Sequence, residues 1–449
     1  MAAPGETESD DFRTRFDLAL GRLTPAGLPG RWLVALSGGL DSTLLLNAVT
    51  RAEPRRAVVA VHVDHGLHAE SAAWSAHCRA LARNLGVDFI ARELGLAPGA
   101  GESLEAAARE ARYAVLAGLV EPGDLVLTAH HADDQLETVL LRLMRGTGVR
   151  GLAAIRETQP FGPGTLARPL LEFTRAEIEI EAKRLGLVWL EDPSNADMRF
   201  DRNYLRAGVL PRLVGRWPAA PSVASRLARQ MAETAALLDE IAAGDLAAVE
   251  DEERIPVAVL ESLSEPRRNN ALRFAIRRLG LPVPSAAQLK ELRLALPARD
   301  DAEACVRWPG AEARLYRRHL YLLRPRHVFP DAAGRLDPDA ALALAGGELR
   351  LVPTDGYGIP DRWARDGLDV AFRAGGERFR PRSSRYHKSL KQWFQESGIV
   401  PWMRGAVPLI YHDDRLIAVA DICLADDLPQ TPDDAPFWRP VWTNHPRLR

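Results

Sequence analysis

Short apolar runs alternate with helix-like segments along the first 144 residues, and this alternation restricts the chain to few folds. Four runs are predicted strands: 31–36, 57–63, 87–93 and 125–129. The segments that separate and follow them have helical periodicity: 43–49, 71–85, 103–119 and 133–144. Strands that alternate with helices form a parallel sheet with helices on both faces. We therefore predict an α/β domain with a doubly wound parallel sheet, whose ligands bind beyond the carboxyl ends of the strands.

The chain of 449 residues is longer than one hydrophobic core usually serves, so we expect further domains after the first. A segment with three prolines, VLPRLVGRWPAAPSV, begins at residue 209 and is typical of a linker. We predict a first domain at 1–216, a helical middle domain at 217–330 and a small α+β domain at 331–449. Short strand-like runs such as GELRLV and RLIAVADI support the last of these.

The composition is that of an ordinary globular protein, with 47% hydrophobic and 26% charged residues. Three cysteines, Cys78, Cys305 and Cys423, are odd in number and far apart, so we predict neither a disulfide framework nor a zinc site. The acidic start MAAPGETESDDF is unlike a signal peptide, and no stretch approaches the roughly 18 apolar residues of a membrane span. We expect a cytoplasmic protein that has no membrane partner.

A loop rich in serine and glycine lies between the first predicted strand and its helix. It consists of Ser37, Gly38, Gly39, Leu40, Asp41 and Ser42. Glycines allow a sharp turn, and backbone N–H groups near a helix N-terminus bind anions such as phosphate. The loop lacks the Gly-Lys-[Ser/Thr] of a Walker A motif, which disfavours enzymes that cleave ATP at the γ-phosphate. A plain turn with a helix cap is the alternative, and Asp41 is a candidate to help hold Mg²⁺.

The second predicted strand ends in HVDHGLH, at residues 62–68. This end lies beside the first loop in an open α/β sheet. His62 and Asp64 are therefore candidates for binding a nucleotide, with backbone contact to the adenine. The three histidines of the segment also fit a metal site, although turn chemistry around Gly66 explains them without one. We predict no metal site built from protein ligands.

The next cluster, HHADDQLET at residues 130–138, follows a strand and opens a helix. Asp134 and Glu137 are three residues apart and share one helical face. Two neighbouring carboxylates can bind an ammonium group. Metal binding and capping of the helix are the alternatives, because acidic residues favour the first helical turn.

Basic residues concentrate in three places. The sequence RNYLR carries Arg202 and Arg206, and REARY carries Arg109 and Arg112. These arginines can neutralise phosphate or substrate, or they can form surface ion pairs. In a chain of net charge −2, residues 362–404 contain ten Lys or Arg against four acids. That segment is a candidate surface for a phosphate backbone, or else a solvated face.

Five motifs occur in order between residues 37 and 206: SGGLDS, HVDHGLH, HHADDQLET, RPLL and EDPSNADMRFDRNYLR. Together they resemble the tRNA(Ile)-lysidine synthases, a family of the PP-loop ATP pyrophosphatase superfamily. The later run GGERFRPRSSRYHKSLKQWFQESGIVPWMRGAVPLI is similar to the last domain of that family. The middle of the chain contributes only length and helicity to the resemblance.

The resemblance implies a fold of the PP-loop ATPase type and a two-step reaction at the wobble cytidine of an isoleucine tRNA with the anticodon CAU. The C2 oxygen of the cytosine attacks the α-phosphate of ATP, which releases pyrophosphate. The ε-amino group of free L-lysine then attacks C2 and expels AMP, leaving lysidine. The implied cofactors and partners are ATP with Mg²⁺, L-lysine and the tRNA, and the sequence leaves a homodimer open.

The family's residue roles carry over by motif. The residues expected to be catalytic are Asp41, Arg112, Asp134, Glu137, Arg202 and Arg206. The loop 37–42 would bind ATP, and Asp134 with Glu137 would receive the lysine ammonium. Arg112 would contact the activated intermediate, and the sequence does not choose between Arg202 and Arg206 for a second such contact. The basic residues expected to hold the tRNA body, away from the anticodon, are Arg378, Arg380, Arg382, Lys388 and Lys391.

One departure and three alternatives qualify this resemblance. Family members often have an arginine where this chain has His68, which puts a phosphate contact in doubt because histidine is mostly neutral at pH 7.

A tRNA thiolase also adenylates a base on a PP-loop, but it delivers sulfur through cysteines that are often paired. Cys78 is instead predicted to be a buried small hydrophobe. A synthetase of small metabolites would leave the basic C-terminal domain without a role. A non-enzymatic RNA-binding module would not need Asp41, Asp134 and Glu137.

Overall fold

The computed structural model describes most of the chain. It covers residues 4–24, 30–64, 71–94, 104–191, 201–297, 304–325, 334–344, 346–382, 384–431, 435–445 and 448, with the side chains of 4–10 and 104–107 excepted. The described chain divides into two compact units, Met1–Glu240 and Ile241–Arg449. Each unit has hydrophobic clusters of its own, so each carries its own core.

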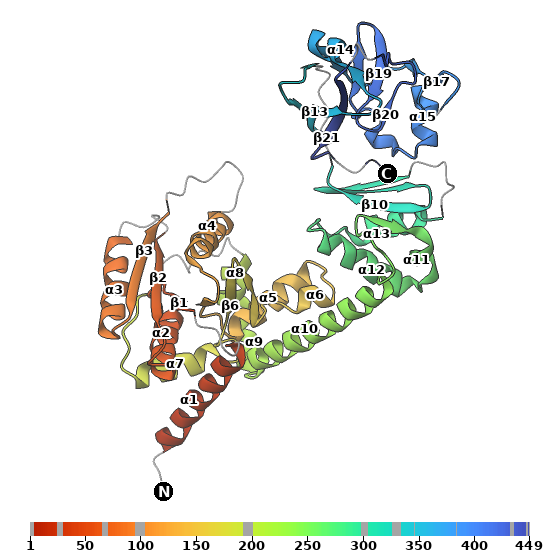
Figure 1. Cartoon of the computed structure of the whole chain (residues 1–449). Coiled ribbons are helices and arrows are strands. Elements are labelled where there is room, and N and C mark those ends of the chain that lie inside the picture. Colours follow the sequence, from red (N-terminus) through yellow and green to blue (C-terminus); the bar gives the residue numbers. More distant parts are fainter. Residues whose placement is uncertain are drawn as a thin grey trace. The chain divides into compact units, whose positions relative to one another are not determined.

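A six-stranded sheet forms the centre of the first unit (Figure 1). Its strands are β1 (Trp32–Ala35), β2 (Val58–Asp64), β3 (Asp88–Glu93), β4 (Leu125–Leu127), β5 (Thr158–Phe161) and β6 (Gly164–Ala167). The strand order is β3-β2-β1-β4-β6-β5, and all neighbours are parallel except β5 and β6. The predicted parallel sheet is confirmed, and the four predicted strands are β1 to β4.

Helices cover both faces of this sheet. They are α1 (Pro4–Leu23), α2 (Leu40–Ala52), α3 (Ser71–Asn84), α4 (Leu104–Leu119) and α7 (Arg175–Arg184). Successive side chains of a strand point to opposite faces, so Trp32 and Val34 of β1 pack in the cluster that contains residues of α1, α2, α3 and α7. Leu33 packs in another cluster, with Leu116 of α4. The helix that follows the loop 37–42 and the helix α4 therefore lie on opposite faces.

A buried carboxylate ties the amino ends of β1 and β4 together. Asp124 is only 2% exposed, and it accepts hydrogen bonds from Arg31 N at 2.8 Å and from Arg31 Nη2 at 2.7 Å. Burial alone would raise the pKa of Asp124, but the hydrogen bonds from Arg31 and from the Glu121 backbone outweigh burial and lower it. This end of the sheet is closed by structural contacts, which leaves ligand binding to the carboxyl end.

Further helices extend the first unit beyond the sheet. They are α5 (Ala132–Met144), α6 (Val149–Leu152), α8 (Asp201–Tyr204), the π-helix η2 (Leu205–Val209), α9 (Leu210–Arg216) and the long α10 (Ala220–Asp245). The first part of α10 belongs to this unit: the Ser225 hydroxyl donates to Leu171 O at 3.1 Å, and Asp239 pairs with Arg150.

The two units divide at residue 240, inside α10. The proline-rich segment near residue 217 lies before that point, and two of its prolines, Pro211 and Pro221, are each the second residue of a helix. A proline is tolerated there because the first helical N–H groups have no partner within the helix. The three-domain boundaries stay a prediction.

The second unit begins with helices packed on a four-stranded antiparallel sheet. The helices are α11 (Val257–Ser262), α12 (Glu265–Arg278) and α13 (Ala286–Ala295), and the strands are β7 (Arg254–Pro256), β8 (Cys305–Trp308), β9 (Ala311–Tyr316) and β10 (His319–Leu323). The strand order is β7-β10-β9-β8. The structure thus adds a sheet to the predicted helical domain. Three of the four strands come from residues 305–323, beyond the helical periodicity on which that prediction rests.

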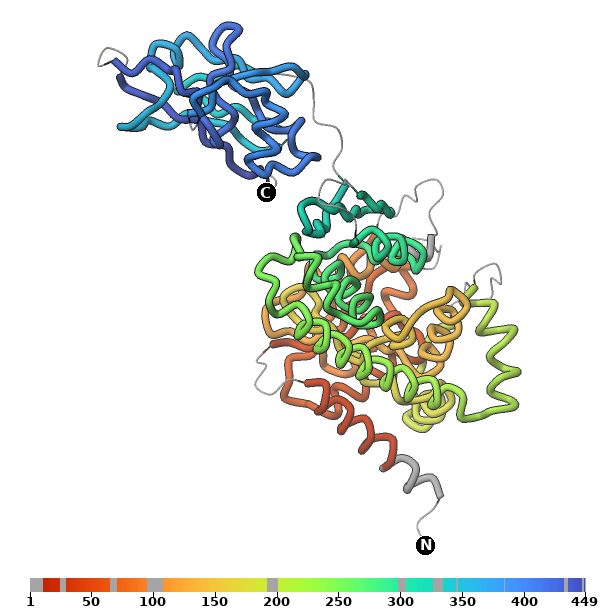
Figure 2. The backbone as a smooth tube through the Cα atoms, turned by 90° about the vertical axis from the view of Figure 1, so that its right-hand side faces the viewer, coloured from red at the N-terminus to blue at the C-terminus, as the bar shows by residue number. Residues whose placement is uncertain are grey.

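The last part of the chain folds as short antiparallel strands around one core, drawn in blue in Figure 2. One sheet contains β11 (Gly334–Leu336), β15 (Leu368–Ala371), β18 (Leu409–His412), β19 (Arg415–Val419) and β20 (Cys423–Leu424). A second contains β12 (Leu342–Leu344), β13 (Gly347–Thr354), β21 (Phe437–Thr443) and β14 (Ile359–Pro360), and β16 (Arg378–Phe379) pairs with β17 (Lys388–Ser389). With the helices α14 (Asp361–Asp366), α15 (Leu390–Glu396) and η3 (Pro401–Met403), these sheets confirm the predicted small α+β fold.

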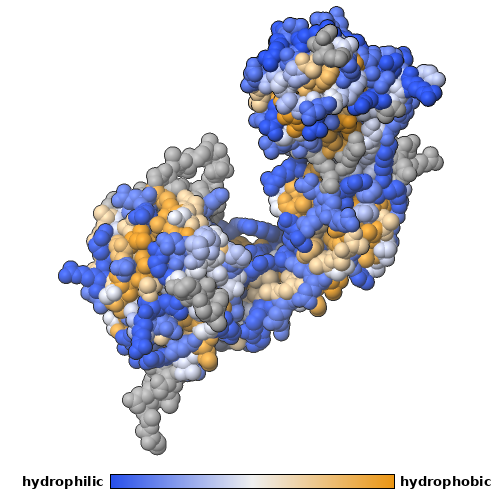
Figure 3. All heavy atoms as spheres, in the orientation of Figure 1, coloured by the Kyte–Doolittle hydropathy of each residue, from blue (hydrophilic) through white to orange (hydrophobic). Residues whose placement is uncertain are grey.

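On the face shown in Figure 3, hydrophilic residues cover most of the surface and apolar residues form patches among them. None of the described helices combines the length and the apolar composition that a membrane span requires.

Candidate active site

The loop 37–42 is held in one shape by its own side chains and by its neighbours. Ser37 N donates to Ser42 Oγ at 3.2 Å, and Ser42 Oγ donates to Gly39 O at 3.1 Å. Gly38 has φ +84°, a conformation that favours glycine, and its carbonyl accepts from Leu190 N at 2.9 Å. The helix α2 begins directly after Gly39. The predicted turn before a helix N-terminus is present, in the arrangement that suits phosphate.

The end of β2 lies next to this loop. His62 is buried, and its Nδ1 is 2.9 Å from Leu36 O, so its side chain fixes the end of β1 rather than facing a ligand. Asp64 is the half-buried last residue of β2. His65 and His68 lie outside the described residues. Among the residues that are described, no group of three His, Cys, Asp or Glu side chains is placed to hold a metal ion.

Glu137 is the centre of an ion-pair network at the start of α5. Its side chain is 1% exposed, and it receives two arginines: Arg202 Nε lies 3.0 Å from Oε2, and Arg206 Nε lies 2.7 Å from Oε1. These arginines come from α8 and η2, more than sixty residues later in the chain. The predicted residues Glu137, Arg202 and Arg206 are therefore brought together, although the partners of Glu137 in this structure are guanidinium groups.

Asp134 caps α5 and also faces Arg206. Its Oδ2 accepts from His131 N at 3.0 Å, and its Oδ1 lies 3.3 Å from Arg206 Nη2. Burial would raise the pKa of Asp134, but the charges of His131 and His130, the backbone hydrogen bond and Arg202 lower it. Asp134 is therefore an ionised carboxylate whose capping role, one of the alternatives from the sequence, is present.

Asp41 joins this network through two residues that the sequence did not single out. Arg175 Nη1 pairs with Asp41 Oδ1, and Arg175 N donates to Asp133 Oδ2 at 2.8 Å. His131 Nε2 lies 3.8 Å from the same Asp41 oxygen. Burial lowers the pKa of His131, but Asp134, Asp133 and Asp41 outweigh burial and raise it.

The residues that contact Asp41 and Asp134 differ in whether the sequence could have indicated them. His131 and Asp133 lie inside the motif HHADDQLET, which could have suggested them. Arg175 is the first residue of α7, in the segment LEFTRAE that carries no chemical pattern, so only the fold brings it to Asp41.

Arg112 lies on α4 at the border of this network. Burial lowers the pKa of Arg112, and the nearby positive charges of Arg109 and Arg202 lower it further against the influence of Tyr113. The side chain of Arg112 is half-buried, and a partly desolvated guanidinium among other cations favours a bound anion. Arg112 is therefore placed to interact with a negatively charged ligand.

The five predicted tRNA-binding cations lie in the second unit and differ in their partners. Arg380 pairs with Asp426 at 3.4 Å, and Lys388 pairs with Glu396 at 2.6 Å. Arg382 lies over the ring of Tyr357, 4.1 Å from its centroid. Arg378 and Lys391 are exposed, and neither has an ion-pair partner among the described residues.

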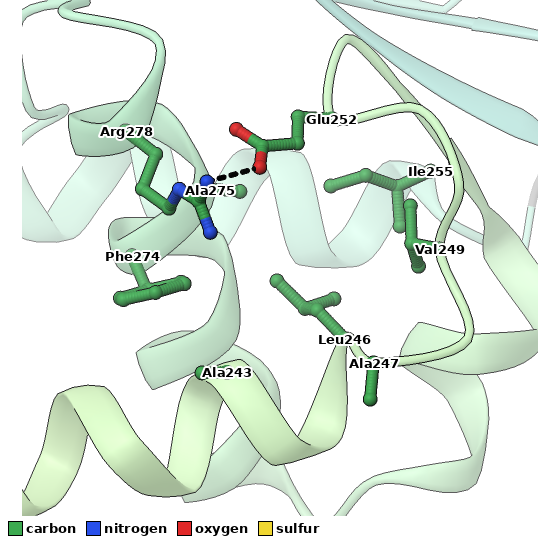
Figure 4. A pocket seen from close by; sticks show the side chains of 9 residues that line it. All are labelled: Ala243, Leu246, Ala247, Val249, Glu252, Ile255, Phe274, Ala275 and Arg278. Carbon is green, nitrogen blue, oxygen red and sulfur yellow. Dashed lines mark ion pairs between the residues drawn. The ribbon is translucent and has the colours of Figure 1, made fainter.

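A pocket of about 220 Å³ in the second unit is unrelated to these clusters (Figure 4). Apolar side chains such as Leu246, Ile255 and Phe274 line it, and its two charged residues, Glu252 and Arg278, pair with each other at 2.6 Å. It offers no unpaired polar group for a reaction.

Known proteins match most of this chain. The model of the PP-loop domain matches residues 14–213, that of the TilS substrate binding domain residues 255–321, and that of the TilS substrate C-terminal domain residues 368–442. The tRNA(Ile)-lysidine synthase of Methylococcus capsulatus is 40% identical over 88% of this chain and 92% of its own length. That of Ralstonia nicotianae is 41% identical over 87% of this chain and 88% of its own.

The chain belongs to the tRNA(Ile)-lysidine synthase family.

Solved structures give a weaker likeness. A U34-tRNA thiolase from Methanococcus maripaludis is 13% identical, with a TM-score of 0.43 over 50% of this chain and 80% of that chain. At that level the likeness does not bear on the choice between lysine and sulfur chemistry.

The three matched family segments fall inside the three predicted domains of this lysidine synthase family member.

Cys78 provides a test against sulfur transfer. It is fully buried, and burial raises the pKa of its thiol to about 12, so it should not react in the native protein because only the thiolate is nucleophilic. We expect iodoacetamide at pH 8 to alkylate the exposed Cys305 in the native protein and Cys78 only after unfolding in guanidinium, as read by peptide mass spectrometry. Equal labelling of both in the native protein would contradict the assignment of Cys78 to the core.

Proposed function

We propose that this protein joins L-lysine to C2 of the wobble cytidine of an isoleucine tRNA with the anticodon CAU, through an adenylated base, with release of pyrophosphate and AMP. The observation that carries the proposal is the network of Asp41, Asp134, Glu137, Arg202 and Arg206 beside a phosphate-binding type of loop. The family membership supports the lysidine product. Because ATP, lysine and tRNA occur together in the cytoplasm, we also propose that location.

The loop 37–42 would bind the phosphates of ATP through its backbone N–H groups. Mg²⁺ in ATP-dependent enzymes is usually held by one or two carboxylates and the substrate phosphates rather than by a protein cage. Asp41 fits that role, since both of its ion-pair contacts run to Oδ1 and its side chain is 27% exposed. Bound Mg²⁺ would neutralise part of the phosphate charge, and Arg175 would keep the Asp41 carboxylate in position.

The lysine ammonium would bind at Asp134 and Glu137. In the structure Arg206 spans both carboxylates, at 3.3 Å and 2.7 Å. The side chain of Arg206 is 42% exposed and that of Arg202 is 25% exposed, so Arg206 is the one that an incoming ammonium would displace. A displaced Arg206 would then be available to bind a phosphate. We therefore propose that Arg206, rather than Arg202, contacts the activated intermediate.

In each of the two steps one bond forms and one bond breaks. The cytosine C2 oxygen forms a bond to the α-phosphorus, and the bond from that phosphorus to the bridging oxygen of pyrophosphate breaks. The lysine ammonium then loses a proton to solvent, the resulting amine forms a bond to C2, and the C2–oxygen bond breaks as AMP leaves. Arg112 would stabilise the negative charge on the phosphate oxygens in both steps, and Arg206 would do so once the lysine ammonium has displaced it.

The proposal is tested by incubating the full-length protein with α-labelled ATP, radiolabelled lysine and a CAU-anticodon isoleucine tRNA. We expect lysine to enter acid-precipitable RNA only when both ATP and this tRNA are present, with one AMP released for each lysine incorporated. A methionine tRNA with the same anticodon serves as the control RNA. Release of AMP without lysine incorporation would overturn the proposal in favour of another nucleophile, as in the thiolase alternative.

Two substitutions separate ammonium binding from helix capping at Asp134. Asn keeps an oxygen that can accept from His131 N but loses the charge, whereas Ala loses both. We expect Asp134→Asn and Asp134→Ala to raise the KM for lysine at least ~10-fold, equivalent to about 1.4 kcal/mol, with an unchanged KM for ATP. If only Asp134→Ala is impaired, Asp134 acts as a cap and the ammonium assignment fails.

The tRNA surface is tested in the second unit. We expect the double variant Arg378→Ala, Lys391→Ala to bind tRNA more weakly and to lower the slope of log affinity against log salt by about 1 to 2, since each phosphate contact contributes roughly 0.7–0.9. The matched control is Lys183→Ala in the first unit, because Lys183 is exposed, is paired with Glu179 and is not among the predicted tRNA-binding cations, so its removal should change binding less. A larger effect in the control than in the double variant would place the RNA contacts elsewhere.

A further inference from the structure

A second charged pocket lies in the first unit, on the side of α4, and the proposed reaction does not use it. Its volume is about 590 Å³, which is in the range of small-ligand sites. The basic residues that line it come from α4, α5, α6 and the segments around β5 and β6: Arg109, Arg142, Arg150, Arg156 and Arg168. Glu110 is the single acid in the lining.

Most of the positive charge in this pocket is not neutralised by the protein. Arg150 pairs with Asp239. Arg142 donates instead to the carbonyl oxygens of Gly151 and Ala154, at 2.8 and 3.1 Å, and the exposed Arg156 has no side-chain partner within the part of the chain that the structure describes. Such a concentration of guanidinium groups requires counter-charge, which the described residues do not supply.

Arg168 is the strongest sign of a missing ligand. It is 4% exposed, and its Nη1 donates to Arg156 O at 2.5 Å, but its Nε has no hydrogen-bond partner among the described residues. The Tyr113 hydroxyl is also buried without a hydrogen bond of good geometry, although it lies close to the Arg168 guanidinium. Buried donors without partners are rare and costly in native proteins. Both residues line this pocket.

The pocket adjoins the reaction centre but not the ATP loop. No residue of the loop 37–42 lines it, and α4 covers the face of the sheet opposite to α2. His130, which follows β4, is within electrostatic reach of both sets of charges: burial is the largest cause that lowers its pKa, Asp134 acts to raise it, and Arg168, Arg109 and Arg202 lower it further. The pocket and the carboxylate of Asp134 therefore both act electrostatically on His130.

We propose that this pocket binds a backbone phosphate of the RNA next to the nucleotide that is modified, with Arg168 and Arg156 as its guanidinium donors and the Tyr113 hydroxyl as a third donor. Planar guanidinium groups match phosphate oxygens in pairs. The proposal rests on the proposed function, which supplies an RNA substrate. A phosphate of ATP or pyrophosphate has the same chemistry, and the separation of the pocket from the loop 37–42 favours the RNA.

The experiment measures binding by the full-length protein of three probes: a 17-nucleotide RNA hairpin with the CAU anticodon loop, ATP and pyrophosphate. We expect Arg109→Gln, Arg156→Gln, a double substitution of exposed side chains, to weaken hairpin binding about 10-fold and to lower the salt slope by roughly 0.7 for each phosphate that the variant no longer binds. ATP and pyrophosphate affinities should not change. The control is Arg83→Gln, an exposed arginine on α3 at the other face of the sheet.

Tyr113→Phe separates a ligand-binding hydroxyl from a structural one. Removing a buried hydroxyl that makes no hydrogen bond of good geometry to the described residues should leave the melting temperature unchanged or raise it, while hairpin affinity falls several-fold. Unchanged hairpin binding in both variants would overturn the proposal, as would an effect confined to ATP or pyrophosphate. Hairpin binding does not require turnover, so a protein that binds through this pocket but incorporates no lysine would refute the proposed function alone.

Discussion

The bond between Glu137 and its two arginines is the interaction on which the site depends. Glu137 lies in the first turns of α5, which starts where β4 ends, whereas Arg202 and Arg206 belong to the segment that leaves the sheet domain for α10. A carboxylate whose side chain is only 1% exposed is costly unless it is paired. Folding of residues 201–209 onto α5 is therefore coupled to the charge of Glu137, and the same contact brings Arg206 to Asp134.

Around this contact, acidic and basic side chains occupy different places relative to the sheet. The loop 37–42 and the acids Asp41 and Asp134 lie where β1 and β4 end, with Arg175 and His131 between the acids. The uncompensated arginines gather on the α4 side. A parallel sheet places the carboxyl ends of its strands at one edge, so guanidinium groups and carboxylates from distant segments meet there and pair with each other.

Much of this arrangement could be predicted from the sequence. The strand and helix alternation, the glycine loop, the carboxylates of α5 and the arginines near residue 204 all have local signatures. What could not be predicted is pairing between distant segments. Arg175 reaches Asp41 from 134 residues away. The buried donors of Tyr113 and Arg168, which lack well-formed hydrogen bonds among the described residues, are brought together only when β6 is placed beside α4. Similarly, strands β8 to β10 follow a long helical stretch whose periodicity ends before them, and the short strand β7 lies within that stretch.

The contact between Gly38 and α3 limits which side chains the interior can hold. A Cβ atom on residue 38 would lie 3.0 Å from Cys78 Sγ, tighter than most such contacts, so the sulfur fills the space directly beneath the loop. A bulkier residue at 78 would push the loop outward, and a smaller one would leave it unsupported. We therefore expect the size of the side chain at position 78 on α3 to determine how well the backbone of the loop keeps its left-handed turn at Gly38, so that helix packing would contribute to nucleotide affinity.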